Sequence, residues 1–356
     1  MNRRSFLKAS ATAASVAQFS RTLLAAETPK PARERIKIGF FGASHSHAFE
    51  KVKLVKESSD FELIGVCDDS ASVRRRFDNQ GVQFLSENEL LTQAQIVAVE
   101  SAVKDHARHA KLALSAGKHV HLEKPPADNL EVFRELVQLA AEKKLLLQMG
   151  YMWRFNPGIN AAIQAARQGW LGEIYLVRAT INTAIAVEQR SEWAQFHGGT
   201  MFELGSHVID PVVRLLGRPD KVTTFLKKHG RFDDTLSDNT VVVLEFPHAL
   251  GVVTSATLQP GSGAHRFFEI LGTNGTALVK PIEQPILQID LAKAAGPYPA
   301  KTQAVNFPPY KRYAAEFREL AESVRERGSL AVTAQEDLLV QETLLRACEM
   351  NDRKPQ

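Results

Sequence analysis

Three residues of this sequence have the types and the spacing that hydride transfer from a secondary alcohol would need. Lys124 stands between Glu123 and Pro125, and its ammonium group could bind the hydroxyl and stabilise the oxyanion that develops as hydride leaves. Glu203 and His207 are four residues apart, which places both on one face of a helix. We therefore expect a catalytic set in which Lys124 acts electrostatically, His207 accepts or relays the proton, and Glu203 orients the substrate or His207. The plain alternatives are a solvated helix face for the pair and a surface position for Lys124.

The histidines and acidic residues of the chain also permit a metal hypothesis. The candidate ligands are His197 with Glu203 and His207, and the pairs His45-x-His47 and His119-x-His121. Glu203 and His207 already have a role in proton transfer, and packing or hydrogen bonding near a cleft accounts for the two pairs. We therefore assign no metal site from the sequence.

A phosphate-binding turn is expected after the first apolar run, residues 35–42 (RIKIGFFG), which is typical of a buried parallel strand. The usual dinucleotide pattern is Gly-x-Gly-x-x-Gly, whose bare backbone amides and following helix hold a pyrophosphate. Here the turn is Gly42-Ala43-Ser44-His45-Ser46-His47, so only the first glycine is in place. This turn alone is weak evidence for a dinucleotide-binding site. We nevertheless expect cofactor contacts from Gly42, Ser44, His45, Ser46 and His47.

Asp68 strengthens the dinucleotide interpretation. It follows the second expected strand, 26 residues after Gly42, where an acidic residue can accept hydrogen bonds from the ribose hydroxyls. A carboxylate repels a 2′-phosphate, so Asp68 favours NAD, whereas the arginines at 74–76 leave NADP open. A helix cap or a turn is the structural alternative for this residue.

Strands and helices alternate through the first part of the chain, which predicts a doubly wound α/β domain. The expected strands cover residues 35–42, 61–67, 96–99, 119–122 and 145–149, and the expected helices cover 46–58, 71–77, 87–91, 106–117 and 129–144. Strands then prevail, at 174–180, 222–227, 240–246, 251–258 and 267–271, with helices at 199–216, 310–327 and 334–349. This second pattern fits an antiparallel sheet with one face covered by helices.

Four motifs in order carry a resemblance to a known family. Residues 116–125 (AGKHVHLEKP) resemble the signature of the Gfo/Idh/MocA oxidoreductases, which include glucose–fructose oxidoreductase and inositol dehydrogenase. Residues 154–157 (RFNP), 169–174 (GWLGEI) and 198–210 (GGTMFELGSHVID) resemble further landmarks of that family. The resemblance covers about residues 35–350. Glu203 stands where the family usually has aspartate, and the loop at 100–106 lacks its usual proline.

The resemblance implies an α/β fold in which a Rossmann-type parallel-sheet domain (35–126) precedes an α+β domain with a large, mainly antiparallel sheet (127–330) and a C-terminal helix (331–356). It implies an NAD(P)-dependent oxidoreductase acting on CH–OH groups of a sugar or cyclitol, with Glu123 and Lys124 also touching the cofactor. It further implies a homo-oligomer, a dimer or a tetramer, formed through the sheet of the second domain.

The excess charge of the chain lies in its first residues. The sequence has 44 basic and 40 acidic residues, and Arg3, Arg4, Lys8 and Arg21 precede the first acidic residue. This segment resembles a twin-arginine export signal over residues 1–26, followed by a linker at 27–34. Without it the chain is formally neutral, so no nucleic-acid partner is expected. No run of 18 apolar residues suggests a membrane anchor, and the two cysteines are expected as free thiols.

Three functions remain open at this point. The first is an exported oxidoreductase in the periplasm or outside the cell, which should hold its NAD tightly and regenerate it, because proteins with such signals fold before export. The second is an NAD-assisted glycoside hydrolase or lyase that acts by transient oxidation and elimination. The third is a non-catalytic cofactor- or sugar-binding protein, supported by Ser44 and His47 in place of glycines. We expect the first.

Overall fold

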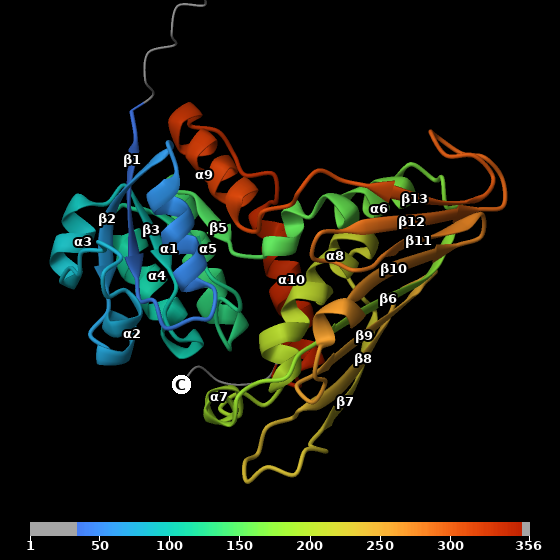
Figure 1. Cartoon of the computed structure of the whole chain (residues 1–356), viewed down its shortest axis with the longest axis horizontal. Coiled ribbons are helices and arrows are strands. Elements are labelled where there is room, and N and C mark those ends of the chain that lie inside the picture. The colour runs from blue at the N-terminus through green and yellow to red at the C-terminus, as the bar shows by residue number, and fades with distance from the viewer. Residues whose placement is uncertain (1–33, 351–356) are drawn as a thin grey trace, which may run out of the picture. The chain divides into compact units, whose positions relative to one another are not determined.

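The computed structural model describes residues 34–350, and its first part is a five-stranded parallel sheet in the order β2-β1-β3-β4-β5 (Figure 1). The strands are short apolar runs that become buried because helices flank the sheet. They are β1 Ile36–Phe41, β2 Phe61–Cys67, β3 Ile96–Val99, β4 His119–Leu122 and β5 Leu147–Met149. The helices between them are α1 Ala48–Glu57, α2 Ala71–Arg76, α3 Glu87–Gln93, α4 His106–Ser115 and α5 Leu130–Glu142. The Rossmann-type prediction is confirmed.

The expected end of the first domain at residue 126 is too early. Helix α5 and strand β5 both follow that residue, and β5 pairs in parallel with β4. The parallel sheet therefore continues to Met149.

The second sheet has eight strands in the order β13-β12-β11-β10-β6-β9-β8-β7. All neighbours are antiparallel except β6 and β9, which run in parallel, so the prediction of a mainly antiparallel sheet is confirmed. The strands are β6 Ile174–Asn182, β7 Lys221–Lys227, β8 Asn239–Glu245, β9 Leu250–Ala256, β10 Phe267–Gly272, β11 Gly275–Val279, β12 Ile286–Leu291 and β13 Thr302–Asn306. The sequence patterns do not single out the last three.

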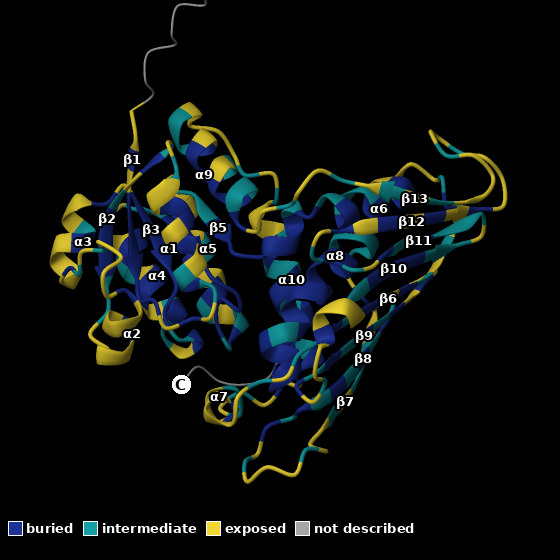
Figure 2. Cartoon of the chain, viewed as in Figure 1, coloured by how far each residue is buried: buried dark blue, intermediate teal, exposed yellow. Residues whose placement is uncertain are grey.

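Helices cover one face of this second sheet. Helix α6 (Pro157–Arg167) packs against β10, β11 and β12, and α8 (Ser206–Leu216) packs against β6 and β9. Helix α10 (Ala334–Ala347) contacts α8 and β7, while the short α7 (Val187–Trp193) precedes the turn into α8. Figure 2 shows α8 and α10 among the most buried helices, whereas α2 and α3 are largely exposed.

Helix α9 (Ala314–Glu326) returns from the second sheet to the first (Figure 1). Phe317 packs its ring edge-on against Phe61 of β2, and Arg325 donates to the Asp60 carboxylate at 2.7 Å. A segment far along the chain thus supplies side chains to the dinucleotide-type domain.

The helix expected at 199–216 is interrupted. Residues Met201–Gly205 form a π-helical turn, and the regular helix α8 begins at Ser206. A π-turn changes the direction of the side chains that it carries, and such turns are frequent at functional sites. Glu203 lies in this turn, so the four-residue spacing to His207 does not describe a regular helical pair.

The expected signal segment and most of the linker lie outside the described residues. Within residues 34–350, no helix is long and apolar enough to cross a membrane. Cys67 is half-buried and Cys348 is buried, and both are free thiols.

A buried arginine holds the helices of the second domain together. Arg154 contacts Asp210 of α8 at 2.7 Å and Asp337 of α10 at 2.6 Å, and its guanidinium lies 4.5 Å from the centroid of the Tyr151 ring. All three charged side chains are buried. The motif at 154–157 therefore positions the two helices.

We expect Arg154→Met to lower the free energy of unfolding by about 3–5 kcal/mol, because Asp337 would remain buried without a cation and Asp210 would keep only the more distant Arg214, at 3.8 Å. Denaturant unfolding followed by circular dichroism measures this. The control is Arg134→Met, which removes an exposed partner of Glu131 and should cost less than about 1 kcal/mol. A variant at residue 154 as stable as the wild type would contradict this role.

Candidate active site

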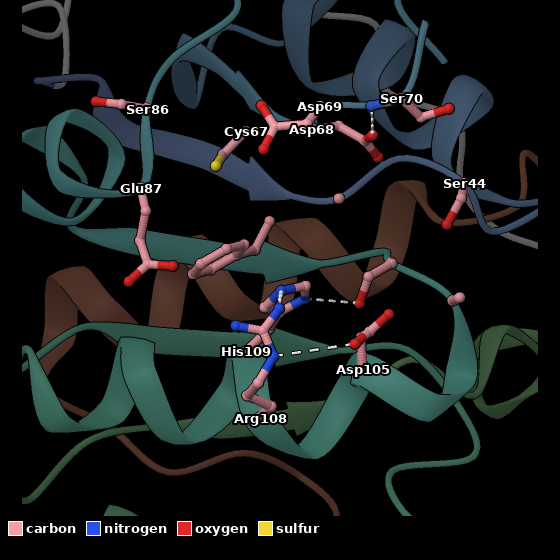
Figure 3. Close-up of a pocket in the computed structure, with 14 residues that line it drawn as sticks. Ser44, Cys67, Asp68, Asp69, Ser70, Ser86, Glu87, Asp105, Arg108 and His109 are labelled. Carbon is pink, nitrogen blue, oxygen red and sulfur yellow. Dashed lines mark hydrogen bonds and ion pairs between the residues drawn. The ribbon is translucent and has the colours of Figure 1, made fainter. Parts of the chain in front are cut away.

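A first cavity lies at the carboxyl ends of the parallel strands, where ligands bind in open α/β sheets. It has a volume of about 420 Å³, and Figure 3 shows its walls. The turn after β1 and the residues after β2 and β3 supply the lining. The lining residues are Phe41, Gly42, Ser44, Cys67, Asp68, Asp69, Ser70, Ser86, Glu87, Ser101, Ala102, Asp105, Arg108 and His109.

Gly42 is the one glycine of the turn, and its position requires glycine. Its φ is +73°, and a Cβ there would come within 2.5 Å of the Ser101 Cα. Asp68 then fixes the turn, because one carboxylate oxygen accepts from the Ala43 N–H at 2.9 Å and the other from the Ser70 N–H at 2.8 Å. Each oxygen keeps a second lone pair, and Asp68 lines the cavity. The site therefore fits the adenosine ribose of a dinucleotide.

The charges around this cavity favour NAD over NADP. Four residues that line the cavity are acidic, whereas Arg108 is the one lysine or arginine among the described residues of its lining. Arg74 turns to Asp69 at 3.6 Å and to the Phe84 ring, and the arginines at 75 and 76 are exposed away from the lining. A 2′-phosphate would meet mainly carboxylates, and would be repelled.

The second cavity, of about 300 Å³, brings the expected catalytic residues together. Lys124, Glu203 and His207 all line it, with Ser46 and His47 from the turn. The Lys124 ammonium donates to the Glu203 carboxylate at 2.6 Å and to the Glu203 backbone carbonyl at 2.9 Å. These contacts leave one ammonium N–H available to a substrate oxygen.

Glu203 is ionised in this setting and His207 is neutral. Burial alone would raise the pKa of Glu203, but the Lys124 ammonium and a hydrogen bond with His45 at 3.2 Å bring it below its usual range. Burial, reinforced by the Lys124 ammonium, holds the pKa of His207 well below its usual range. His207 Nδ1 is buried without a hydrogen-bond partner. It is therefore available as a proton acceptor.

The expected pairing of Glu203 with His207 is not what the structure shows. Because Glu203 sits in the π-turn, its carboxylate meets Lys124 and His45 instead. His207 lies between rings, with the His47 and Trp153 centroids each 5.6 Å away. Glu203 orients the lysine.

A buried lysine that the sequence analysis missed stands behind these residues. Lys51 of α1 is fully buried, with its ammonium 2.5 Å from Glu123, 2.8 Å from Glu100 and 2.9 Å from His121 Nε2. Glu100 and Glu123, together with the Glu316 carboxylate at 3.9 Å, raise the pKa of Lys51 against the effect of burial. The missed signal is a lysine on the apolar stripe of α1, between Ala48 and Val52.

The other expected cofactor residues divide between the two cavities. Gly42, Ser44 and Asp68 line the first, whereas Ser46, His47 and Lys124 line the second. His45 is buried against Glu203. Glu123 is fully buried, accepts the Lys124 backbone N–H at 3.0 Å and lines neither cavity. The turn at 42–47 thus contributes to both cavities, as a dinucleotide that spans them would require.

The structure does not assemble the metal set of His197, Glu203 and His207. His197 is exposed and pairs with Glu349. His119 accepts the Leu146 backbone N–H, and His121 belongs to the cluster around Lys51.

Two glycines before the π-turn serve packing. A Cβ at Gly198 would clash with Cys348 of the segment after α10, and one at Gly199 would lie 2.8 Å from the Ser237 carbonyl oxygen. Of the aromatic residues, Trp193 lines the second cavity, while Trp153 is buried.

A parallel sheet whose first turn serves both a ribose-type cavity and a buried lysine–carboxylate pair defines a dinucleotide-binding oxidoreductase. Residues 36–151 match the model of the "oxidoreductase family, NAD-binding Rossmann fold", and residues 159–278 match the "GFO/IDH/MocA C-terminal domain". The chain belongs to the Gfo/Idh/MocA oxidoreductase family.

The chain is similar to proteins of known name. It is 24% identical over 349 residues to a scyllo-inositol 2-dehydrogenase (NADP(+)) of Bacillus subtilis, covering 90% of this chain and 95% of the relative. It is 30% identical over 172 residues to a D-glucoside 3-dehydrogenase of Escherichia coli, covering 45% of this chain and 48% of the relative, about half of each. The solved structure of GenD2 from gentamicin A biosynthesis, in complex with NAD, shares its fold with a TM-score of 0.74 at 20% identity, covering 90% of this chain and 95% of that one.

We expect Asp68→Asn to weaken NAD binding about 10- to 100-fold, because the loss of a charge-assisted hydrogen bond costs about 1.5–3 kcal/mol. Calorimetric titration of nucleotide-free protein measures it. Asp78→Asn removes the same charge from an exposed residue outside this cavity and should change the affinity less than about threefold. NAD affinity unchanged by Asp68→Asn would refute the ribose assignment.

Proposed function

We propose that this chain is an NAD-dependent oxidoreductase that transfers hydride between the cofactor and a hydroxyl or carbonyl group of a sugar or cyclitol. The observation that carries the proposal is the buried contact of 2.6 Å between Lys124 and Glu203 at the wall of the second cavity. Two relatives are named as dehydrogenases of scyllo-inositol and of a D-glucoside, which supports a ring polyol as substrate.

Lys124, Glu203 and His207 each have a role in this proposal. NAD, when bound, supplies the acceptor and donor of hydride. Lys124 binds the substrate oxygen through its remaining N–H and stabilises negative charge on it, because Glu203 fixes the ammonium in a site with little water. Neutral His207 takes the proton from the hydroxyl and returns it in the reverse direction.

The NAD preference follows from the acidic lining of the first cavity, although one relative is named as NADP-dependent. We extend the proposal to a tightly held cofactor and to export by the twin-arginine pathway to the periplasm or beyond. Free nicotinamide cofactor is scarce outside the cytoplasm, so an exported enzyme has to carry and regenerate its own.

We further propose a homo-oligomer formed through the open face of the second sheet. The strand register places Phe225 of β7, Val243 of β8 and Val252 of β9 on the face opposite to α8. Phe225 is half-exposed there, as is Ile286 of β12. Apolar side chains on an uncovered face support an interface between copies.

Lys124→Met should lower kcat about 10²- to 10⁴-fold with NAD binding retained, because the substrate oxygen loses its cation and donor. The assay is the absorbance of reduced nicotinamide with a panel of sugars and cyclitols. Lys111→Met, at an exposed lysine paired with Glu135, is the matched control and should keep the wild-type rate. Equal rates in both variants would contradict the catalytic role of Lys124.

Native mass spectrometry of protein recovered from the periplasm tests the remaining proposals together. We expect a chain that lacks about the first 26 residues, in a dimer or tetramer, with one nicotinamide dinucleotide per subunit. Replacing Arg3 and Arg4 by lysine should keep the protein in the cytoplasm. Full-length protein that is found only in the cytoplasm would contradict export, and a monomeric, nucleotide-free species in the periplasm would contradict the other two proposals.

A further inference from the structure

The second cavity contains two arginines that the proposed hydride transfer does not use. Arg266 and Arg312 both line it, together with Lys124. Arg266 stands directly before β10 and Arg312 stands shortly before α9, so distant parts of the chain bring the two side chains to one cavity (Figure 1). Like charges in one cavity repel each other, so this arrangement calls for an anion that compensates them.

The protein compensates the charge of Arg266 only in part. Its Nε donates to the Asn182 carbonyl oxygen at 3.0 Å, which fixes the guanidinium group and leaves both terminal nitrogens available. Within residues 34–350, Arg266 forms no ion pair. Burial lowers the pKa of Arg266, the Glu283 carboxylate opposes this effect, and Arg312 adds to it. Arg266 therefore offers hydrogen-bond donors and a positive charge to a ligand.

Arg312 has a distant carboxylate as its partner. Its Nε lies 3.8 Å from one oxygen of Glu283, whose other oxygen accepts from the Trp153 indole N–H at 3.3 Å. The Arg312 side chain is 42% exposed, so water screens this ion pair. The single carboxylate of Glu283 thus stands beside two guanidinium groups.

The acidic residues that line the cavity do not supply the missing charge. Glu203 is committed to the Lys124 ammonium at 2.6 Å, and Glu50 is exposed to water, which screens its charge. Because Glu283 faces both arginines, one positive charge remains for a ligand.

A row of aromatic rings leads from Arg312 to the catalytic residues. The Arg312 guanidinium carbon lies 5.6 Å from the centroid of the Tyr313 ring, which lies 5.5 Å from that of His47. The His47 ring in turn lies 5.6 Å from that of His207. All four side chains line the second cavity. The arginines therefore belong to the part of the wall where a substituent away from the reacting hydroxyl would lie.

We propose that Arg266 and Arg312 bind an anionic group of the substrate, a carboxylate or a phosphate, so that the substrate is an acidic sugar or cyclitol. This inference rests on the proposed function, because it names the substrate class of the same site. Guanidinium groups bind both kinds of anion through paired N–H donors. An uncharged polyol would leave the charge of these two arginines uncompensated.

The pyrophosphate of the cofactor does not account for the two arginines. It is expected at the turn of residues 42–47 and at the beginning of α1. Neither arginine lines the first cavity, which that turn shares with Asp68.

The test measures binding rather than turnover. Full-length protein saturated with NADH, which cannot accept hydride, is titrated by calorimetry with methyl D-glucoside, methyl D-glucuronide and methyl D-glucoside 6-phosphate, and with the corresponding galactosides. An acidic probe of at least one set should bind about tenfold or more tightly than its neutral counterpart. The carboxylate and phosphate probes distinguish the two kinds of anion. Hydride transfer is assayed separately with NAD, so its failure and a failure of this proposal are different results.

The variants are Arg266→Gln and Arg312→Gln, with Arg266→Lys to keep the charge and Arg134→Gln as the control at an exposed arginine. Each glutamine variant at 266 or 312 should bind the acidic probe about tenfold or more weakly, and the neutral probe within about threefold of wild type. Arg266→Lys should give an intermediate affinity, because it keeps the charge and loses the paired donors. NADH binding should stay at the wild-type level in all variants, which also reports whether they fold.

Three results would overturn the proposal. One is wild-type protein that binds no acidic probe more tightly than its neutral counterpart. Another is folded Arg266→Gln and Arg312→Gln proteins that keep the affinity of the Arg134→Gln control for the acidic probe. The third is a loss of NADH binding in folded variants, which would assign the arginines to the cofactor.

Discussion

The fold depends on the burial of two lysines where the parallel sheet meets the second domain. Lys51 is compensated by carboxylates that follow β3 and β4 and by Glu316 from α9, and Lys124 is compensated by Glu203 from the π-turn. A buried ammonium without its partner costs several kcal/mol. Helix α9 and the π-turn must therefore return to this edge of the sheet from distant parts of the sequence. The same compensation keeps the Lys124 ammonium fixed at the wall of the second cavity.

The acidic partners of Lys51 differ in the direction in which their pKa values are shifted. Burial raises the pKa of Glu100 to about 7 and that of Glu316 to about 8. The pKa of Glu123 lies well below its usual range, because Lys51 and the neighbouring histidines favour the ionised carboxylate. The raised pKa values mean that Glu100 and Glu316 exchange protons near neutral pH, whereas Glu123 stays ionised beside Lys51. Glu100 and Glu316 both make a contribution to stability that is fully present below the unfolded pKa of 4.5 and is lost as the pH rises from there through about 7 to 8.

The sequence predicts elements that have a local, repeated pattern. It misses contacts between distant residues and single departures from a regular helix. The first four strands, the ends of most helices and the positions of Lys124 and Asp68 follow from apolar runs and motif spacing. The π-turn at Glu203 leaves the apolar periodicity unchanged, so the spacing to His207 suggested a pair that the structure does not form. Glu316 joins the site through tertiary folding, and the only local sign of it is a charged residue one turn before Leu320 on the buried stripe of its helix. Lys51 did leave a signal, as a charged residue on an apolar stripe.

We expect hydride to move directly between a ring carbon of the substrate and a nicotinamide held beside Lys124. The most direct measurement uses scyllo-inositol and D-glucosides that carry deuterium at the reacting carbons, mixed with the cofactor-loaded enzyme in ordinary water. The account predicts that the reduced cofactor, released by denaturation and weighed by mass spectrometry, contains one deuterium. A cofactor that is reduced without deuterium, or is not reduced by any member of a broad panel of sugars and cyclitols, would contradict it.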